Sequence, residues 1–209
     1  MEKIKLEPKP GLLPVLGAYP VIMIGTDVDG APDFTTVAWT GVAASLPPSI
    51  TIALQHHRHS LKGVRQHMSF SVNIPGTGQV NETDYCGLAS GKRVDKAADC
   101  RFEIFYGKLD GVPFIKQCPV NHACEVVQIL NLGSHELIVG KIVETFVSED
   151  CMTDGRPDPA KIRPFMFAGL GYFSLGERCG NAFQSGVSIN PKAKLDTLDE
   201  LKRMSREDK

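Results

Sequence analysis

A cluster of basic residues lies at the junction between an apolar run and a helical pattern. Residues 56–60 read His-His-Arg-His-Ser and follow the apolar run 49–55. Ser60 stands where it could cap a short helix over residues 61–67. Because a helix N-terminus offers unpaired N–H groups and a favourable dipole, Arg58 and Ser60 could hold an anion there. A solvated basic turn explains the same residues equally well.

A second segment, residues 87–96 (GLASGKRVDK), combines glycines with a hydroxyl and a lysine. Gly91 would let the backbone approach a ligand closely, while Ser90 and Lys92 could offer a hydroxyl and a charge to a phosphate. The segment matches no complete P-loop. His135, at the turn of a later hairpin, could add another donor, although a lone loop histidine is more often merely solvated.

Two adjacent threonines, Thr35 and Thr36, lie in a predicted strand that also contains Trp39. Side chains alternate along a strand, so at most one of the two hydroxyls faces a given pocket. On this pattern alone, ordinary strand threonines are the simpler interpretation.

Other kinds of chemistry lack their sequence signatures. The chain has no GxSxG, no GxGxxG and no Walker loop, and no serine or cysteine has a neighbour that marks an activating base. Two thiols and an imidazole within residues 118–124 match no common zinc spacing. We therefore expect six reduced cysteines, no metal, and a site that binds an anionic cofactor.

The composition of the whole chain is that of one ordinary globular domain. Of 209 residues, 42% are hydrophobic and 22% are charged, and the formal net charge is -1. Such a chain has no long-range attraction for nucleic acid or for anionic membranes. We find no signal peptide and no stretch long enough to span a bilayer, so we expect a cytoplasmic protein without nucleic-acid or membrane partners.

Hydrophobic residues alternate with a period of two along most of the chain, which predicts many short strands. Turn signals at residues 27–30 and 132–134 predict two hairpins, the second of them long and apolar on both faces. Many short strands favour a closed or nearly closed barrel, because closure removes exposed strand edges. The predicted strands are residues 21–26, 33–40, 49–55, 69–74, 123–131, 135–147 and 165–170, with short helices over 61–67 and 79–89.

The composition changes beyond residue 180. We predict one domain over residues 1–180 and a partly helical tail over residues 181–209. In this tail, apolar residues recur every three positions among mixed charges, at Leu195, Leu198, Leu201 and Met204.

The order of several segments resembles the flavin reductase-like, FMN-binding split-barrel family, and within it the flavoredoxin branch. The similar stretches follow one another through most of residues 11–178: DFTTVAW (33–39), SLPP (45–48), RHSLKG (58–63), FSVNIP (70–75), DYCGLASGKRVDK (84–96), LGSHE (132–136) and EDCMTDG (149–155). The resemblance implies a mainly β fold with short helices, an FMN-binding split β-barrel. It also implies a homodimer with one FMN for each subunit.

Roles for individual residues follow from the same resemblance. Thr36 would lie near N5 or O4 of the flavin, flanked by Thr35 and Trp39. Tyr172 or Phe173 would cover the cofactor. The remaining contacts would come from Arg58, Ser60, Lys92 and His135 at the phosphate, and from Asn73, Ser90 and Gly91 at the ribityl chain and ring.

Fold and cofactor together leave the activity open. The chain could be an enzyme in which NAD(P)H reduces bound FMN and electrons pass to free flavin or another acceptor. It could instead be a carrier of flavoredoxin type that exchanges electrons with a redox protein. Storage or sensing of flavin is a third alternative.

Overall fold

The computed structural model describes residues 3–7, 9, 17–182 and 184–189. The chain divides into two units, Met1–Leu175 and Gly176–Lys209. The described part of the second unit contains one short 3₁₀ helix, η3 (Ser185–Ser188). The helix predicted within residues 181–209 has its apolar residues at 195–204, which lie outside the described residues. The predicted boundary at residue 180 stays a prediction.

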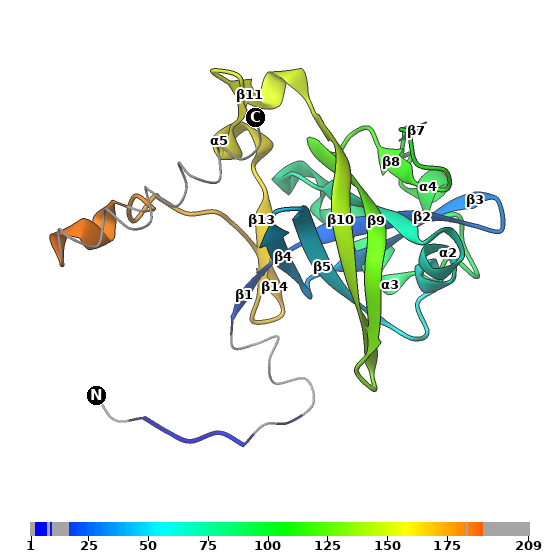
Figure 1. Ribbon diagram of the computed structural model, residues 1–209, viewed down its shortest axis with the longest axis horizontal. Coiled ribbons are helices and arrows are strands. Elements are labelled where there is room, and N and C mark those ends of the chain that lie inside the picture. Colours follow the sequence, from blue (N-terminus) through cyan, green and yellow to red (C-terminus); the bar gives the residue numbers. More distant parts are fainter. Residues whose placement is uncertain (1–2, 8, 10–16, 183, 190–209) are drawn as a thin grey trace. The chain divides into compact units, whose positions relative to one another are not determined.

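Seven strands of the first unit form one antiparallel sheet (Figure 1). Their order across the sheet is β3-β2-β6-β9-β10-β5-β4. The prediction of a mainly β chain is confirmed. The bounds are β2 (Ile22–Val28), β3 (Ala31–Val37), β4 (Thr40–Ser45), β5 (Pro48–Gln55), β6 (Ser69–Ile74), β9 (Val120–Asn131) and β10 (His135–Val147).

Smaller sheets and short helices complete this unit. A three-stranded sheet contains β1 (Ala18–Pro20), β13 (Phe165–Ala168) and β14 (Gly171–Ser174), and two strand pairs are β7 (Ile104–Tyr106) with β8 (Pro113–Ile115) and β11 (Met152–Thr153) with β12 (Arg156–Pro157). The helices are α2 (Ser60–His67), α3 (Val80–Leu88), α4 (Lys96–Asp99) and α5 (Pro159–Ile162), with 3₁₀ helices η1 (Thr77–Gln79) and η2 (Glu149–Cys151). Among the described residues, no helix is long and apolar enough to cross a membrane.

The hairpin of β2 and β3 confirms the first turn prediction. Its turn residues Asp29 and Gly30 have φ values of 54° and 84°, the positive values that a type I′ turn requires. The second strand ends at Val37 instead of reaching Thr40, and Thr40 begins β4, which the sequence pattern did not predict. The prediction was too long because the two strands are separated only by residues 38 and 39, without glycine or proline.

The hairpin of β9 and β10 is the longest strand pair and was predicted from its sequence (Figure 1). The pairing is irregular next to Gly140, where an added Cβ would lie 2.6 Å from the Phe70 ring. Toward the turn, Val127, Leu130 and Leu132 are 62%, 41% and 60% exposed. Part of the hairpin is therefore an exposed apolar surface.

Strand β2 is buried on both faces, and this organises the core. Ile24 packs into one cluster with Leu61 of α2. The preceding residue, Met23, points to the opposite face of the strand. It packs into a second cluster with Phe34 of β3 and Cys86 of α3. Helices α2 and α3 both contact β3 as well. The segments at the start of α2 and the end of α3 are thereby held next to the same strand.

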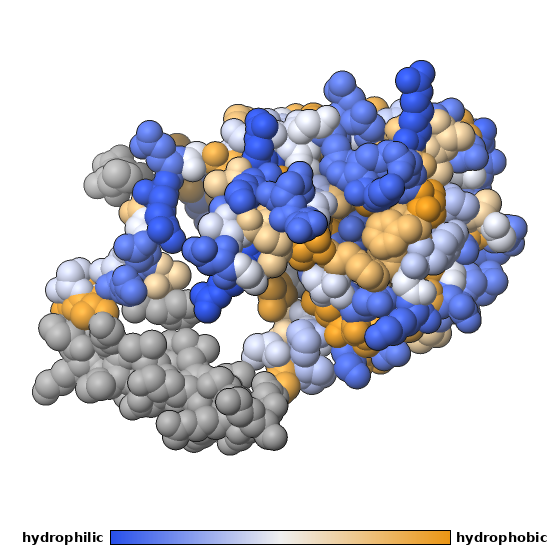
Figure 2. All heavy atoms as spheres, turned by 90° about the horizontal axis from the view of Figure 1, so that it is seen from above, coloured by the Kyte–Doolittle hydropathy of each residue, from blue (hydrophilic) through white to orange (hydrophobic). Residues whose placement is uncertain are grey.

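The surface of the molecule is mixed in character. Figure 2 shows hydrophilic residues over much of one face, with hydrophobic residues emerging between them. Single exposed apolar residues are normal in soluble proteins, because polar surface is too scarce to cover a fold. Val127, Leu130 and Leu132 differ from such single residues because they lie close together near the turn of the β9–β10 hairpin. We name these three residues the hairpin surface.

Candidate functional site

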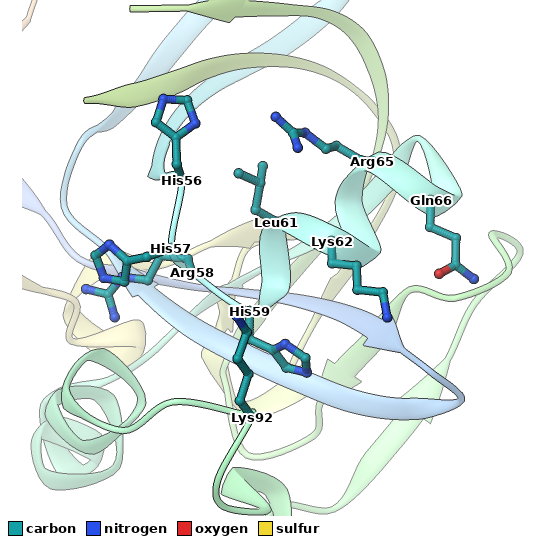
Figure 3. Close-up of a pocket in the computed structure, with 9 residues that line it drawn as sticks. All are labelled: His56, His57, Arg58, His59, Leu61, Lys62, Arg65, Gln66 and Lys92. Carbon is teal, nitrogen blue, oxygen red and sulfur yellow. The ribbon is translucent and has the colours of Figure 1, made fainter. Parts of the chain in front are cut away.

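A group of basic residues lines a hollow of about 690 Å³ at the start of α2 (Figure 3). Most of its residues come from the turn between β5 and α2 and from the exposed side of that helix, while Lys92 reaches it from the segment after α3. None of the lining residues is acidic. We name it the basic hollow, and it is lined by His56, His57, Arg58, His59, Leu61, Lys62, Arg65, Gln66 and Lys92.

The cations of the basic hollow differ in whether their charge is already paired with a carboxylate of the protein. Lys62 is 2.6 Å from Asp29, and Arg65 makes two hydrogen bonds to Glu136. Lys92, in contrast, has no hydrogen bond or ion pair with any described residue. Because an unpaired ammonium group keeps its full charge for a ligand, Lys92 is the most available cation of the hollow.

Arg58 links the basic hollow to a second hollow. Its Nη1 donates a hydrogen bond of 2.5 Å to the carbonyl of Gly87, at the end of α3. Burial lowers the pKa of the guanidinium, and the nearby carboxylate of Asp33 opposes this shift. Arg58 lines both hollows, so a single cation borders two adjoining spaces.

The second hollow has a volume of about 180 Å³ and contains four of the predicted site residues together. Thr36 points into it from β3, and its hydroxyl donates to the carbonyl of Thr83. Tyr172 of β14 donates 2.8 Å to Asp84, and burial with this contact raises the pKa of the phenol to about 12. We name it the aromatic hollow, lined by Val21, Thr36, Ala38, Trp39, Arg58, Asp84, Gly87, Leu88, Phe167 and Tyr172.

His135 lies beside these residues without lining either hollow. Its ring stacks on Trp39, with centroids 5.9 Å apart, and its Nδ1 is 2.8 Å from the Ser134 hydroxyl. Burial, followed by the charges of His56, Arg58 and His57, lowers the pKa of His135. His135 thus stacks on a residue that lines the aromatic hollow together with Arg58, so residues of three separate segments meet in this region.

Three other predicted residues, Ser60, Thr35 and Asn73, are buried inside the protein. Ser60 is fully buried and donates 2.6 Å to Asp33. Its prediction as the helix cap was wrong, because α2 begins at Ser60 and His59 occupies the cap position. Thr35 is buried on the face of β3 opposite Thr36, and its hydroxyl has no hydrogen-bond partner among the described residues.

The structure does not place Asn73 at either hollow. Its amide nitrogen donates to Met23 and Ser71, and its carbonyl oxygen accepts from Ile115 and Asn121. Because these four bonds use the whole hydrogen-bonding capacity of a buried amide, Asn73 has none left for a ligand. In this structure the side chain of Asn73 joins β6 to its neighbours, and the flavin contact predicted there stays a prediction.

The remaining predictions concern the segment after α3. Ser90 is half-buried, and its carbonyl accepts the backbone N–H groups of Arg93 and Val94. Gly91 lines a third hollow of about 300 Å³, between β3 and its own segment, together with Asp33 and His59. Ser90 and Gly91 thus shape the loop that presents Lys92, and neither lines the basic or the aromatic hollow.

Sequence reasoning missed the apolar residues of the aromatic hollow. Val21 lies between β1 and β2, Leu88 ends α3 and Phe167 lies on β13, and nothing in their local patterns marks them as residues of one site. Lys62 and Arg65 were also missed, although their spacing of three residues on a helix after a basic cluster signals one basic face.

The thiols of residues 118–124 lie in separate parts of the core. Cys118 packs with Met23, whereas Cys124 packs with Ile24 on the opposite face of β2. Burial raises the pKa of each thiol to about 12. The described residues include no group of three or more histidines, cysteines or acidic residues that could hold a metal ion.

The comparisons with known proteins agree on one family. The model of the flavin reductase like domain matches residues 17–175. Among solved structures, a flavoredoxin from Methanosarcina acetivorans is 32% identical with a TM-score of 0.83, covering 90% of this chain and 100% of that one. A flavoredoxin from Desulfovibrio vulgaris (Miyazaki F) is 28% identical with a TM-score of 0.78, covering 87% and 100%.

A more distant structure shares the fold. An FMN-binding protein from Thermus thermophilus is 22% identical with a TM-score of 0.73, covering 87% of this chain and 99% of that one. The family match spans most of the first unit, including both hollows. The chain therefore belongs to the flavin reductase-like family and has the split-barrel fold of its structural neighbours.

Proposed function

We propose that this chain binds FMN and transfers electrons from NAD(P)H through it to free flavin or to another acceptor. Arg58 and Lys92 would hold the phosphate, assisted by His135, while Thr36, Trp39 and Tyr172 would border the ring. The fold alone leaves the cofactor open, so the proposal depends on how these side chains are arranged.

One observation carries the proposal: the basic hollow and the aromatic hollow share Arg58. FMN has a phosphate at one end, which suits the basic hollow, and a planar ring at the other end, which suits the aromatic hollow. The fit is supported by the unpaired ammonium of Lys92, because a phosphate group prefers cations whose charge is not already neutralised. The family match and the FMN-binding neighbour support the same cofactor.

Bound FMN would supply the hydride and electron chemistry, and the protein would supply binding and orientation. Arg58 and Lys92 offset the charge of the phosphate. The Thr36 hydroxyl donates to Thr83 in this structure, and turning it to a ring atom would exchange one neutral hydrogen bond, worth about 1 kcal/mol, for another of similar strength. Tyr172, fixed by Asp84, closes one side of the aromatic hollow and limits entry of water.

A second function, electron carriage between proteins, is favoured by a specific observation. The two solved structures above 25% identity described here are both flavoredoxins. A carrier would exchange electrons with a redox protein and would show no appreciable reduction by either nicotinamide nucleotide. The two functions use the same FMN site and differ only in the electron donor.

The first experiment identifies the cofactor, and the second separates the two functions. We expect a yellow purified protein from which heat releases FMN and no FAD, and a colourless protein that fails to bind added FMN would refute the proposal. Anaerobic stopped-flow reduction by NADH, NADPH and reduced ferredoxin then follows the flavin absorbance. Fast reduction by a nicotinamide supports the enzyme, whereas reduction by ferredoxin alone supports the carrier.

We also propose that the protein is a cytoplasmic homodimer. The hairpin surface of Val127, Leu130 and Leu132 supports this, since a second copy would cover apolar groups that one subunit leaves exposed. Sedimentation velocity at micromolar concentration should give a dimer, and Val127→Lys should weaken it. A monomer that still binds FMN would contradict the dimer and leave the cofactor proposal intact.

A further inference from the structure

A buried ion pair lies directly behind the proposed phosphate site. Lys96, at the start of α4, is 3% exposed, and its Nζ lies 3.2 Å from Asp33 on β3. The same ammonium group donates to the backbone carbonyls of Phe34 and Cys86. Asp33 is itself buried, and its second oxygen accepts the Ser60 hydroxyl at 2.6 Å.

These contacts join the two segments that carry the phosphate-binding cations. Ser60 lies two residues after Arg58, and Lys96 lies four residues after Lys92. Gly91 packs against the same carboxylate so closely that an added Cβ would overlap Asp33 Oδ1 and lie 2.9 Å from His59. The Asp33 carboxylate is thus held between the start of α2 and the loop that presents Lys92.

The arrangement places a negative charge where an anion is expected to bind. Asp33 accepts the Ser60 hydroxyl two residues after Arg58, so the carboxylate lies next to the basic hollow, and its charge opposes the lowering of the Arg58 pKa by burial. An uncompensated carboxylate there would repel a phosphate. Lys96 compensates it, and because both groups are buried the compensation is little screened by salt.

Stability alone is a poor reason for such a pair. The cost of removing two charges from water commonly equals or exceeds their attraction, so a buried pair is often replaceable by apolar residues without loss. A role in holding and neutralising the site accounts for its position between Ser60 and Gly91.

We infer that Asp33 and Lys96 are positioning residues for the phosphate of the bound flavin. Asp33 fixes the segments of Arg58 and Lys92 relative to each other, and Lys96 cancels its charge so that a phosphate can bind beside it. The inference rests on the proposed FMN binding. It adds two residues that line neither the basic hollow nor the aromatic hollow.

The test compares two flavins that differ only in the phosphate. Lys96→Gln removes the buried cation and keeps an amide that can donate to the carbonyls of Phe34 and Cys86. We expect its dissociation constant for FMN to rise about tenfold or more, with a change of less than about threefold for riboflavin. The double variant Asp33→Asn/Lys96→Gln removes both charges and should bring FMN affinity back to within about threefold of wild type.

A matched control breaks an ion pair outside the site. Glu103→Gln disrupts the exposed pair with Lys116, whose atoms are 3.0 Å apart, and should leave both flavin affinities unchanged. Flavin fluorescence titration gives the affinities, and thermal unfolding gives the stability of each variant. A structural role alone would lower the melting temperature of Lys96→Gln and weaken both flavins equally.

Each outcome decides between the alternatives. Equal losses for FMN and riboflavin, or a double variant as weak as Lys96→Gln, would overturn the inference. If Lys96→Gln does not fold, the double variant alone is decisive: the inference requires it to bind FMN within about threefold of wild type. A wild-type protein that binds no FMN would remove the proposed function, and the inference with it, which is a distinguishable result.

Discussion

The indole of Trp39 stacks on the imidazole of His135, with ring centroids 5.9 Å apart and planes inclined by 29°. Trp39 is the only tryptophan of the chain. It stands between β3 and β4, and His135 is the first residue of β10, so the contact joins two segments that are distant in sequence and separated in the sheet only by β5. The contact also places this single tryptophan, whose fluorescence can be followed, against the titratable ring of His135 at the edge of the proposed site.

We therefore predict that tryptophan fluorescence reports the protonation of His135. Because burial and neighbouring cations lower the pKa of His135 from its ordinary value of about 6.5, we expect the midpoint of its protonation to lie below that value. The charged ring draws electron density from the indole face and should quench its emission. Fluorescence of the flavin-free protein, followed from pH 8 to pH 5, should fall with a midpoint below 6.5.

The titration has a matched control and a thermodynamic counterpart. His135→Gln should abolish the transition, whereas His122→Gln should keep it, since burial also lowers the pKa of His122 but its ring bonds to Thr145. Since the folded state binds the His135 proton less tightly than the unfolded state, the free energy of unfolding should decrease as pH falls through this range. A midpoint above 6.5 would contradict the assigned environment.

Loss of Lys92 should weaken FMN and leave riboflavin unaffected. Removing one charged hydrogen bond to phosphate costs about 1.5–3 kcal/mol, or roughly ten- to a hundredfold in affinity. Lys62→Ala is the control, because Lys62 lines the same hollow but is paired with Asp29. Fluorescence titration of both variants with both flavins checks this, and an equal loss for riboflavin would place Lys92 at the ring.

Arg58 should behave differently from Lys92. It borders both hollows and bonds to Gly87, so Arg58→Ala disturbs the ring side as well as the phosphate side. We expect riboflavin affinity to fall together with FMN affinity in the same titrations. A loss confined to FMN would show that the bond to Gly87 has no effect on the aromatic hollow.

Gly91→Ala should destabilise the fold. The added methyl overlaps the Asp33 carboxylate, and forcing a group into a packed site costs about 1–3 kcal/mol. Gly78→Ala is the control, because no atom lies within 4 Å of the Cβ it would add. Urea unfolding curves measure the difference, and a Gly91→Ala protein as stable as wild type would show that the loop can move aside freely.

One thiol should react far faster than those of the core. Cys179 is exposed, whereas Cys86 is fully buried and burial raises its pKa well above the ordinary range. Iodoacetamide at pH 8 should modify Cys179 first and leave FMN binding intact. Peptide mapping identifies the site, Cys179→Ser should remove the fast phase, and fast labelling of Cys86 would require an opening of α3.

The parts of the fold predicted from sequence are those with local signals. The β2–β3 and β9–β10 hairpins were predicted because turn residues separate alternating runs. Strand β1 was missed because its three residues form a strand only by pairing with β13, far along the chain, where Ala18 pairs with Ala168. Strand β4 was missed because its exposed residues, such as Val42, show no regular alternation.

Sequence alone predicted the exposed cations near the site more readily than the polar residues that are buried behind it. Arg58 and Lys92 are long cations, which remain near the surface whatever the fold. The buried hydrogen bonds of Ser60 and Asn73 were not predicted, because local sequence does not show whether a polar group will find its partner inside the protein. Asp33 and Lys96 were not identified for the same reason, since each becomes buried only through the other.

The pairing of β5 with β10 has a consequence for synthesis of the chain. Gln55 pairs with His135, so one edge of β5 has no partner until about eighty more residues have left the ribosome. At about 5–20 residues per second, this interval lasts roughly 4–16 s. During that time Ile52 and Leu54, fully buried in the finished sheet, belong to an open strand edge on the nascent chain. Slow or paused translation lengthens this interval, so the codons of residues 56–135 influence how much protein escapes aggregation.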